Sequence, residues 1–236
     1  NYKVIEYVIK KGCPEILVEL YGVWDKPEDV EFESLPNEFV LKSNNGCGTV
    51  KIVKNKNVLD YKKVIKEMRT WVSRPFGYMG AQVHYLAIQP RIIAERLLIG
   101  DECQRLISPE SLIDYKVWCI NGIPECILVI FGREGLQYYR QVYDINWEPM
   151  PHVLAKSTRH SLYTDIQIPK PECLDKLLEY ARILSEDFPE VRVDFYVIDN
   201  QPIFGELTFS AGMGTLSDEY YNYLGSKIDL SKYQTK

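Results

Sequence analysis

The chain is 236 residues long, with 46% hydrophobic residues, 26% charged residues and a formal net charge of −5. Such a composition predicts a globular protein with one domain or two closely joined lobes and a sizeable core. The acidic balance argues against a dedicated nucleic-acid-binding protein. No apolar run approaches the ~20 residues of a membrane span, and the given sequence predicts no signal peptide. Six cysteines without a Cys-x-x-Cys pair predict free thiols, as in a reducing cytoplasm, and no zinc site or disulfide framework.

Residues 1–36 form an N-terminal lead-in segment. A short helical pattern ends at Gly12, and Ile16–Leu20 predicts an apolar strand. The chain begins with Asn1 and not with methionine, which leaves open that the natural N-terminus lies further upstream.

Residues 37–53 predict two strands joined by a flexible turn. Phe39–Leu41 and Val50–Val53 are the strands, Ser43–Gly48 is the turn, and Lys42 stands at the end of the first strand. Glycines among small polar residues let backbone N–H groups converge on an anion, and a lysine supplies a point charge. The order G-x-x-x-x-G-K-[ST] of a P-loop is absent. The alternative is a plain β-hairpin with a surface lysine.

Residues 58–73 predict an amphipathic helix. Its apolar stripe consists of Tyr61, Val64, Ile65, Met68, Trp71 and Val72. This stripe is typical of core packing.

A buried strand at Ile92–Ala94 ends in Glu95 and continues into Arg96 and two leucines. Backbone groups of such a segment can read the edge of a purine while leucines cover its face. The alternative is a glutamate that only reaches water.

A second hairpin is predicted with its turn at Asn121-Gly122, the strongest short hairpin signal. Asp114 and Lys116 alternate with apolar residues in its first strand, so both point to one face. They either pair with each other or bind a ligand.

Residues 132–169 look irregular, and a stretch of this length is usually a functional loop or lid. Arg140 within it suits a contact to a γ-phosphate or an acylphosphate, because a guanidinium grips phosphate in a bidentate way. Pro171 then opens a helix that runs to about Asp187.

The stretch 191–214 predicts a third hairpin, with its turn at Asp199-Asn200. Asp194 on the first strand and Glu206 on the second then lie almost opposite each other. Like charges facing each other destabilise a sheet, so a divalent cation is the usual reason to keep them. The alternative is one exposed acid and one acid paired with Arg192.

The residues after Glu206 let the backbone turn sharply at the edge of a site. They include Thr208, Ser210, Gly212 and Gly214. The arrangement is Arg-x-Asp on one strand and Gly-Glu-x-Thr-x-x-x-Gly on the next. It resembles the metal-binding hairpin of the ATP-grasp enzymes, D-alanine–D-alanine ligases among them. The family usually carries Glu-x-Asn here, whereas this chain has Thr208 in the Asn position.

The resemblance extends from about Tyr7 to Leu230. The motifs DYK-x-x-C-x-NG and FGELTF are similar to those of the TupA-like branch of the ATP-grasp superfamily, which is associated with bacterial surface-polymer biosynthesis. It implies an α+β ATP-grasp fold, in which two α+β lobes with mostly antiparallel sheets grip ATP between them. Residues 37–97 would be the small lobe with its glycine-rich flap, and residues 98–236 the large lobe with the metal-binding hairpin.

The resemblance also implies roles for single residues. The metal ligands for Mg²⁺ would be Asp194, Glu206 and Thr208. The ATP-binding residues would be Lys42, Asn45, Gly46, Gly48, Thr49, Glu95, Leu98, Asp114 and Lys116, with Glu95 and Leu98 beside the adenine and Asp114 on the ribose. Arg192, Arg140 and Lys42 would stabilise the charge that develops during the reaction.

The activity so implied is that of a cytoplasmic bacterial ATP-dependent carboxylate–amine ligase acting through an acylphosphate. It would attach an amino acid or similar amine to a uronic acid or amino acid of a surface polysaccharide. A glycosyltransferase partner would supply the acceptor site if a preceding domain is missing. A sugar kinase and a nucleotide-binding module without turnover remain open as alternatives.

Overall fold

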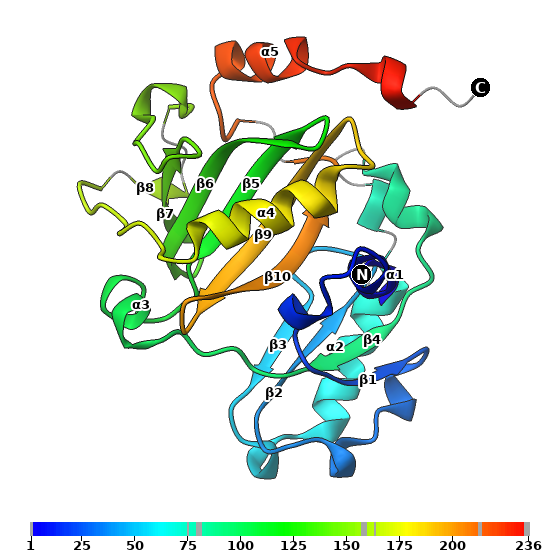
Figure 1. Ribbon diagram of the computed structural model, residues 1–236. Helices are drawn as coiled ribbons and strands as arrows, with labels where there is room; N and C mark the ends of the chain where they lie inside the picture. Colours follow the sequence, from blue (N-terminus) through cyan, green and yellow to red (C-terminus); the bar gives the residue numbers. More distant parts are fainter. Residues whose placement is uncertain are drawn as a thin grey trace. The chain divides into compact units, whose positions relative to one another are not determined.

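The computed structural model describes residues 2–74, 76–78, 82–156, 160–162, 164–211 and 214–233. The chain divides into two compact units (Figure 1). The smaller unit consists of Asn1–Glu6 and Val18–Leu98, and the larger unit of Tyr7–Leu17 and Ile99–Lys236. Helix α1 (Tyr2–Lys10) crosses from one to the other, so residues 1–36 contribute to both units.

The smaller unit contains a four-stranded antiparallel sheet with the strand order β1-β4-β2-β3. Its strands are β1 (Leu20–Trp24), β2 (Phe39–Ser43), β3 (Val50–Val53) and β4 (Ile92–Glu95). Helix α2 (Tyr61–Ser73) begins after Asp60, whose carboxylate accepts a hydrogen bond from the N–H of Lys63. The predicted apolar stripe is confirmed, because Val64, Met68 and Trp71 lie in one buried cluster with residues of β2 and β4.

The larger unit contains a six-stranded sheet with the order β10-β9-β5-β6-β7-β8, antiparallel except for the β7–β8 pair. Its strands are β5 (Asp114–Ile120), β6 (Ile123–Glu134), β7 (Gln137–Tyr143), β8 (Ser161–Leu162), β9 (Glu190–Ile198) and β10 (Gln201–Thr208). Its further helices are α3 (Glu102–Ile107), α4 (Leu174–Ser185) and α5 (Asp218–Ser226). Helix α4 lies across β9, β5 and β6 (Figure 1).

The two faces of this sheet differ. On β5, Cys119 faces α4, where its thiol lies 3.8 Å from the carbonyl oxygen of Ala181. Successive side chains of a strand point to opposite faces, so Asp114, Lys116 and Trp118 share the face away from α4. Trp118 packs there in a second buried cluster that includes Leu224 of α5. The charged half of this face carries the candidate site.

Both long hairpins form as predicted. The turn residues Asn121, Gly122, Asp199 and Asn200 all have positive φ, between 47° and 80°. Two central residues with positive φ define the type I′ turn, whose twist matches that of the flanking strands. The predicted strand–turn–strand of residues 39–53 is also confirmed.

Two predictions about elements are wrong. Residues 14–16 form a 3₁₀ turn, and the first strand begins only at Leu20. Residues 132–143, predicted as irregular, belong largely to the sheet, because β6 continues to Glu134 and β7 follows. The sequence of β7, QYYRQVY, does not show a clear alternation of polar and apolar residues, because two of its three tyrosines are adjacent. Among the residues that the structure describes, no helix is long and apolar enough to cross a membrane.

Candidate active site

The hairpin of β9 and β10 places Asp194 directly opposite Glu206, as predicted. A β-bulge at Gly205 produces this register. From Gln201↔Ile198 to Phe204↔Phe195 the pairing follows the turn, and after Gly205 it shifts by one residue. Without the extra residue Glu206 would face α4, since a one-residue slip turns each side chain to the other face.

Asp194 is buried, with 3% of its surface exposed, and lies between two cations. Its Oδ1 accepts from Arg192 Nε at 2.7 Å, and its Oδ2 accepts from Arg192 Nη2 at 2.8 Å and from Lys116 Nζ at 2.6 Å. Burial alone would raise the pKa of Asp194, but the charges of Lys116 and Arg192 outweigh it and hold the pKa below its usual range. Asp194 is therefore a carboxylate fixed in its ionised form.

Glu206 differs from its neighbour. Its side chain is 59% exposed, and its Oε1 accepts a hydrogen bond from the Thr208 hydroxyl at 3.2 Å. The pKa of Glu206 is raised, first by the protein around its carboxyl group and then by the negative charge of Asp194. Arg192 Nη2, at 3.8 Å, does not offset these effects. The arrangement agrees with the alternative of one exposed acid and one acid paired with Arg192.

The donor set fits Mg²⁺ only in part. Within the described residues, no group of three or more His, Cys, Asp or Glu side chains could hold a metal. Mg²⁺, however, is often bound through one or two carboxylates with water and substrate phosphates completing its shell. Two facing carboxylates, one with a raised pKa, meet that requirement. The Thr208 hydroxyl is already engaged, because it also accepts from Arg192 Nη2 at 3.1 Å.

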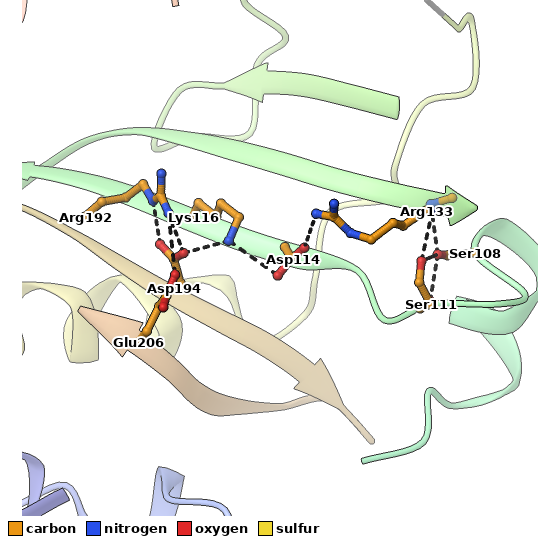
Figure 2. A network of polar contacts seen from close by, with 9 residues as sticks. Ser108, Ser111, Asp114, Lys116, Arg133, Arg192, Asp194 and Glu206 are labelled. Atoms are coloured by element: carbon orange, nitrogen blue, oxygen red, sulfur yellow. Dashed lines mark hydrogen bonds and ion pairs between the residues drawn. The ribbon is translucent and has the colours of Figure 1, made fainter. Parts of the chain in front are cut away.

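The charges continue as a row of alternating sign (Figure 2). Lys116 Nζ lies 3.4 Å from Asp114 Oδ1, and Asp114 Oδ2 lies 3.5 Å from Arg133 Nη2. We call this set the charge row, made up of Glu206, Arg192, Asp194, Lys116, Asp114 and Arg133. Its three acids and three cations balance, and its two ends are the most exposed members.

Asp114 and Lys116 thus make the ion pair that was one of the two readings of their spacing. Burial alone would lower the pKa of Lys116, but Asp194 and Asp114 raise it above its usual value. Lys116 is buried with a fixed positive charge between two carboxylates, so it organises the site whether or not it also contacts a nucleotide.

Arg192 completes the centre of the row. It lies opposite Trp118 in the register of β9 and β5, and its guanidinium stands 5.4 Å from the centroid of the indole ring. Burial would lower its pKa, but the neighbouring acids raise it. Arg192 is therefore held in its charged form beside both carboxylates.

Arg140 has contacts that do not fit the predicted role. It is buried in β7, and its guanidinium donates to the backbone carbonyls of Gly214, Thr215, Ala155 and Lys156 at 2.9–3.4 Å. A guanidinium has five N–H donors, so these four bonds leave little capacity for a phosphate. Arg140 holds two backbone segments together. Gly212, expected to help the chain turn here, lies outside the described residues.

In the smaller unit, Lys42 Nζ forms an ion pair with Glu95 Oε2 at 2.5 Å. The two residues lie on adjacent strands, since Lys42 pairs with Ile93 and Val40 with Glu95. The residues predicted for phosphate and for adenine therefore neutralise each other in this structure.

The loop 43–49 has a fixed base and an open tip. The hydroxyls of Ser43 and Thr49 lie 2.7 Å apart and close the base. Asn45 points inward, where its Nδ2 donates to Trp71 O at 3.2 Å and its buried Oδ1 has no hydrogen-bond partner among the residues that the structure describes. Gly46 lies against Phe76, and Gly48 has φ of +74°. Asn45 thus anchors the loop to the end of α2.

A cavity of about 370 Å³ opens beside the end of β4 in the smaller unit. Its lining consists of Tyr21, Pro36, Asn37, Glu38, Arg96 and Leu97. Leu98, predicted to flank an adenine, is not among them, so the structure leaves its role a prediction.

Three residues of the site were not predicted from the sequence. Arg133 extends the charge row, Tyr196 lies near its three acids, and Gly205 makes the bulge. Burial and these acids raise the pKa of Tyr196, so it stays a neutral phenol. Gly205 carried a signal, because a glycine inside a strand often marks a bulge.

Comparison with solved structures identifies the class of fold. A D-alanine–D-alanine ligase from Bacillus anthracis complexed with ATP aligns with 96% of this chain and 60% of its own, at 16% identity and a TM-score of 0.51. A second structure of the D-alanine–D-alanine ligase from Bacillus anthracis aligns with 94% and 61%, at 17% identity and a TM-score of 0.53. The fold is that of the ATP-grasp ligases, and the chain spans about 60% of the length of these relatives.

The comparison with protein families gives a narrower assignment than the fold does. The model of the TupA-like ATPgrasp family matches residues 1–229, so the chain belongs to that family. No curated protein matches the chain significantly.

Proposed function

We propose that the protein is an ATP-dependent carboxylate–amine ligase. The observation that carries the proposal is the facing pair Asp194 and Glu206, held beside Arg192 and Lys116 on one face of an ATP-grasp sheet. A triphosphate and a hard cation need acidic and basic groups side by side. The charge row offers both on the four adjacent strands β10, β9, β5 and β6.

Asp194 and Glu206 would hold Mg²⁺, which supplies charge neutralisation for the phosphates of ATP when bound. In the smaller unit, Lys42 and the loop 43–49 bind the triphosphate. The N–H groups of Gly46 and Gly48 donate to no acceptor within the described part of the chain, so they are available to an anion. Thr208 keeps Glu206 and Arg192 in place rather than ligating the cation.

The reaction needs no protein nucleophile. A substrate carboxylate attacks the γ-phosphorus of ATP and forms an acylphosphate, ADP leaves, and an amine then displaces phosphate. Arg192 would stabilise the negative charge that develops, because a fixed guanidinium beside the reacting groups requires no reorganisation. We no longer assign Arg140 to the stabilisation of this charge, because its guanidinium already donates to four backbone carbonyls.

The substrates we propose are a uronic acid or amino acid of a bacterial surface polysaccharide and an amino acid or similar amine. The family resemblance supports this class. A cytoplasmic location and a glycosyltransferase partner belong to the same proposal.

A nucleotide-binding module without turnover is a second candidate, favoured by one observation. Both oxygens of Asp194 accept hydrogen bonds from Arg192 or Lys116, so a cation must compete with them. Turnover requires that one of these contacts give way.

The test is release of ADP and phosphate with Mg·ATP across a panel of uronic acids and amino acids, offered singly and in pairs. Release that requires both a carboxylate and an amine supports the ligase. Transfer of phosphate to a sugar alone would show a kinase instead, and nucleotide binding without release across the panel would favour the module.

A further inference from the structure

Arg133 forms the basic end of the charge row. Its side chain is 45% exposed, whereas the side chains of Arg192 and Lys116 are 12% and 11% exposed. Within the described residues, the polar partner of its guanidinium is Asp114, at 3.5 Å, and Lys116 shares that carboxylate. Most of its five N–H donors therefore meet no acceptor within the described residues and can bind an outside group.

The backbone around Arg133 is held in place. A register shift between Phe131 and Glu134 marks a second bulge, where Gly132 has φ of +57°. Gly132 N–H donates to Ser108 Oγ at 2.9 Å, and Arg133 N–H donates to Ser111 Oγ at 3.0 Å. The bulge lets Arg133 reach Asp114, just as the bulge at Gly205 brings Glu206 opposite Asp194.

The side chain of Arg133 is also positioned. Its guanidinium lies 5.1 Å from the centroid of the Tyr138 ring (Figure 2 shows Arg133 pointing along the sheet towards Asp114). A side chain fixed between an aromatic ring and a carboxylate, with free donors, is pre-organised for a planar anion. A carboxylate matches the fork of a guanidinium in a bidentate way.

We propose that Arg133 is a substrate-binding residue that holds a carboxylate of the ligase's substrate. The inference rests on the proposed function and adds the residue that selects an acidic substrate. Phosphates of ATP are the less suitable occupant, because Lys116 and Asp114 separate Arg133 from the facing carboxylates that would hold their cation. The carboxylate comes either from the amino acid or from the uronic acid.

The test measures equilibrium binding by calorimetry with the whole chain in Mg²⁺ and AMPPNP. The carboxylate probes are L-glutamate and D-glucuronate, which separate the two sources. Arg133→Gln is expected to weaken binding of at least one probe by about ten-fold or more, as for loss of a charge-assisted hydrogen bond. Arg133→Lys keeps the positive charge but lacks the bidentate guanidinium, so its affinity for the probes should lie between those of wild type and Arg133→Gln. Arg182→Gln, an exposed arginine on α4, is the matched control.

The affinity for AMPPNP should stay within about two-fold of wild type in every variant. The inference is overturned if wild type binds neither probe, if Arg133→Gln binds them as tightly as wild type, or if it loses AMPPNP affinity instead. Failure of the proposed function has a different signature, namely a wild-type protein that does not bind AMPPNP, or that binds it but releases no ADP with any pair of carboxylate and amine. Unchanged thermal unfolding of Arg133→Gln excludes a folding defect.

Discussion

At the scale of the residue, Asp194 and Glu206 are two facing carboxylates whose ionised forms have opposite effects on folding stability. Asp194 is buried and stabilised by Lys116 and Arg192, so its ionised form contributes to folding. Glu206 is exposed and has a raised pKa, so its ionised form opposes folding slightly. A charge kept at a cost to stability is typical of a functional position.

This contrast predicts different effects of two conservative substitutions. Asp194→Asn removes the charge between two buried cations and is expected to lower the free energy of unfolding by about 3–5 kcal/mol. Glu206→Gln should leave stability unchanged or raise it slightly. Urea denaturation of both variants measures the difference, and equal stability of the two would contradict it. Asp194→Asn is therefore expected to fold with clearly reduced stability.

The same contrast has a pH dependence. The folded-state pKa of Glu206 lies above its unfolded value of about 4.3, so ionised Glu206 destabilises the wild type at neutral pH. This cost disappears as the pH falls towards about 4. The advantage of Glu206→Gln over wild type should therefore be largest near pH 7 and shrink on acidification. The pKa of Asp194 is lowered, so its contribution persists over this range and is lost only below about pH 4. A constant difference between pH 7 and pH 4 would refute the assignment for Glu206.

At the scale of the element, two bulges bring the ends of the charge row onto one face of the sheet. The bulge at Gly205 is tight, because a Cβ there would lie 3.1 Å from Asp194 O and 3.6 Å from the Tyr196 ring. Both neighbours belong to the site. The glycine is therefore needed for the position of Asp194 as well as for the register of Glu206.

Gly205→Ala is expected to lower the free energy of unfolding by about 1–3 kcal/mol, as overpacking does, and to weaken nucleotide binding. Gly225→Ala in α5 is the matched control, because a Cβ there meets nothing within 4 Å. That control should gain about 0.5–1 kcal/mol from helix propensity. Thermal and urea unfolding of both variants test this, and wild-type behaviour of Gly205→Ala would count against a tight bulge.

At the scale of the whole molecule, the sequence predicted the hairpins because their turns carry Asn-Gly and Asp-Asn, and α2 because its apolar stripe is regular. It also placed Asp194 opposite Glu206. Counting residues from the turn alone would pair Glu206 with Val193, and the extra residue Gly205 shifts the pairing to Asp194. The partners of Arg140 and Asn45 could not be predicted, since each binds backbone groups brought there by the fold. Arg133 was missed for the same reason, because its bulge and its ion pair depend on strand pairing.

In the proposed function, Asp194 and Glu206 hold the cation that accompanies ATP. The most direct measurement is calorimetric titration of wild type and Glu206→Gln with AMPPNP, with and without Mg²⁺. We expect Mg²⁺ to strengthen AMPPNP binding to wild type and this gain to be lost in Glu206→Gln, which is expected to fold as stably as wild type. An equal gain from Mg²⁺ in both proteins would contradict it.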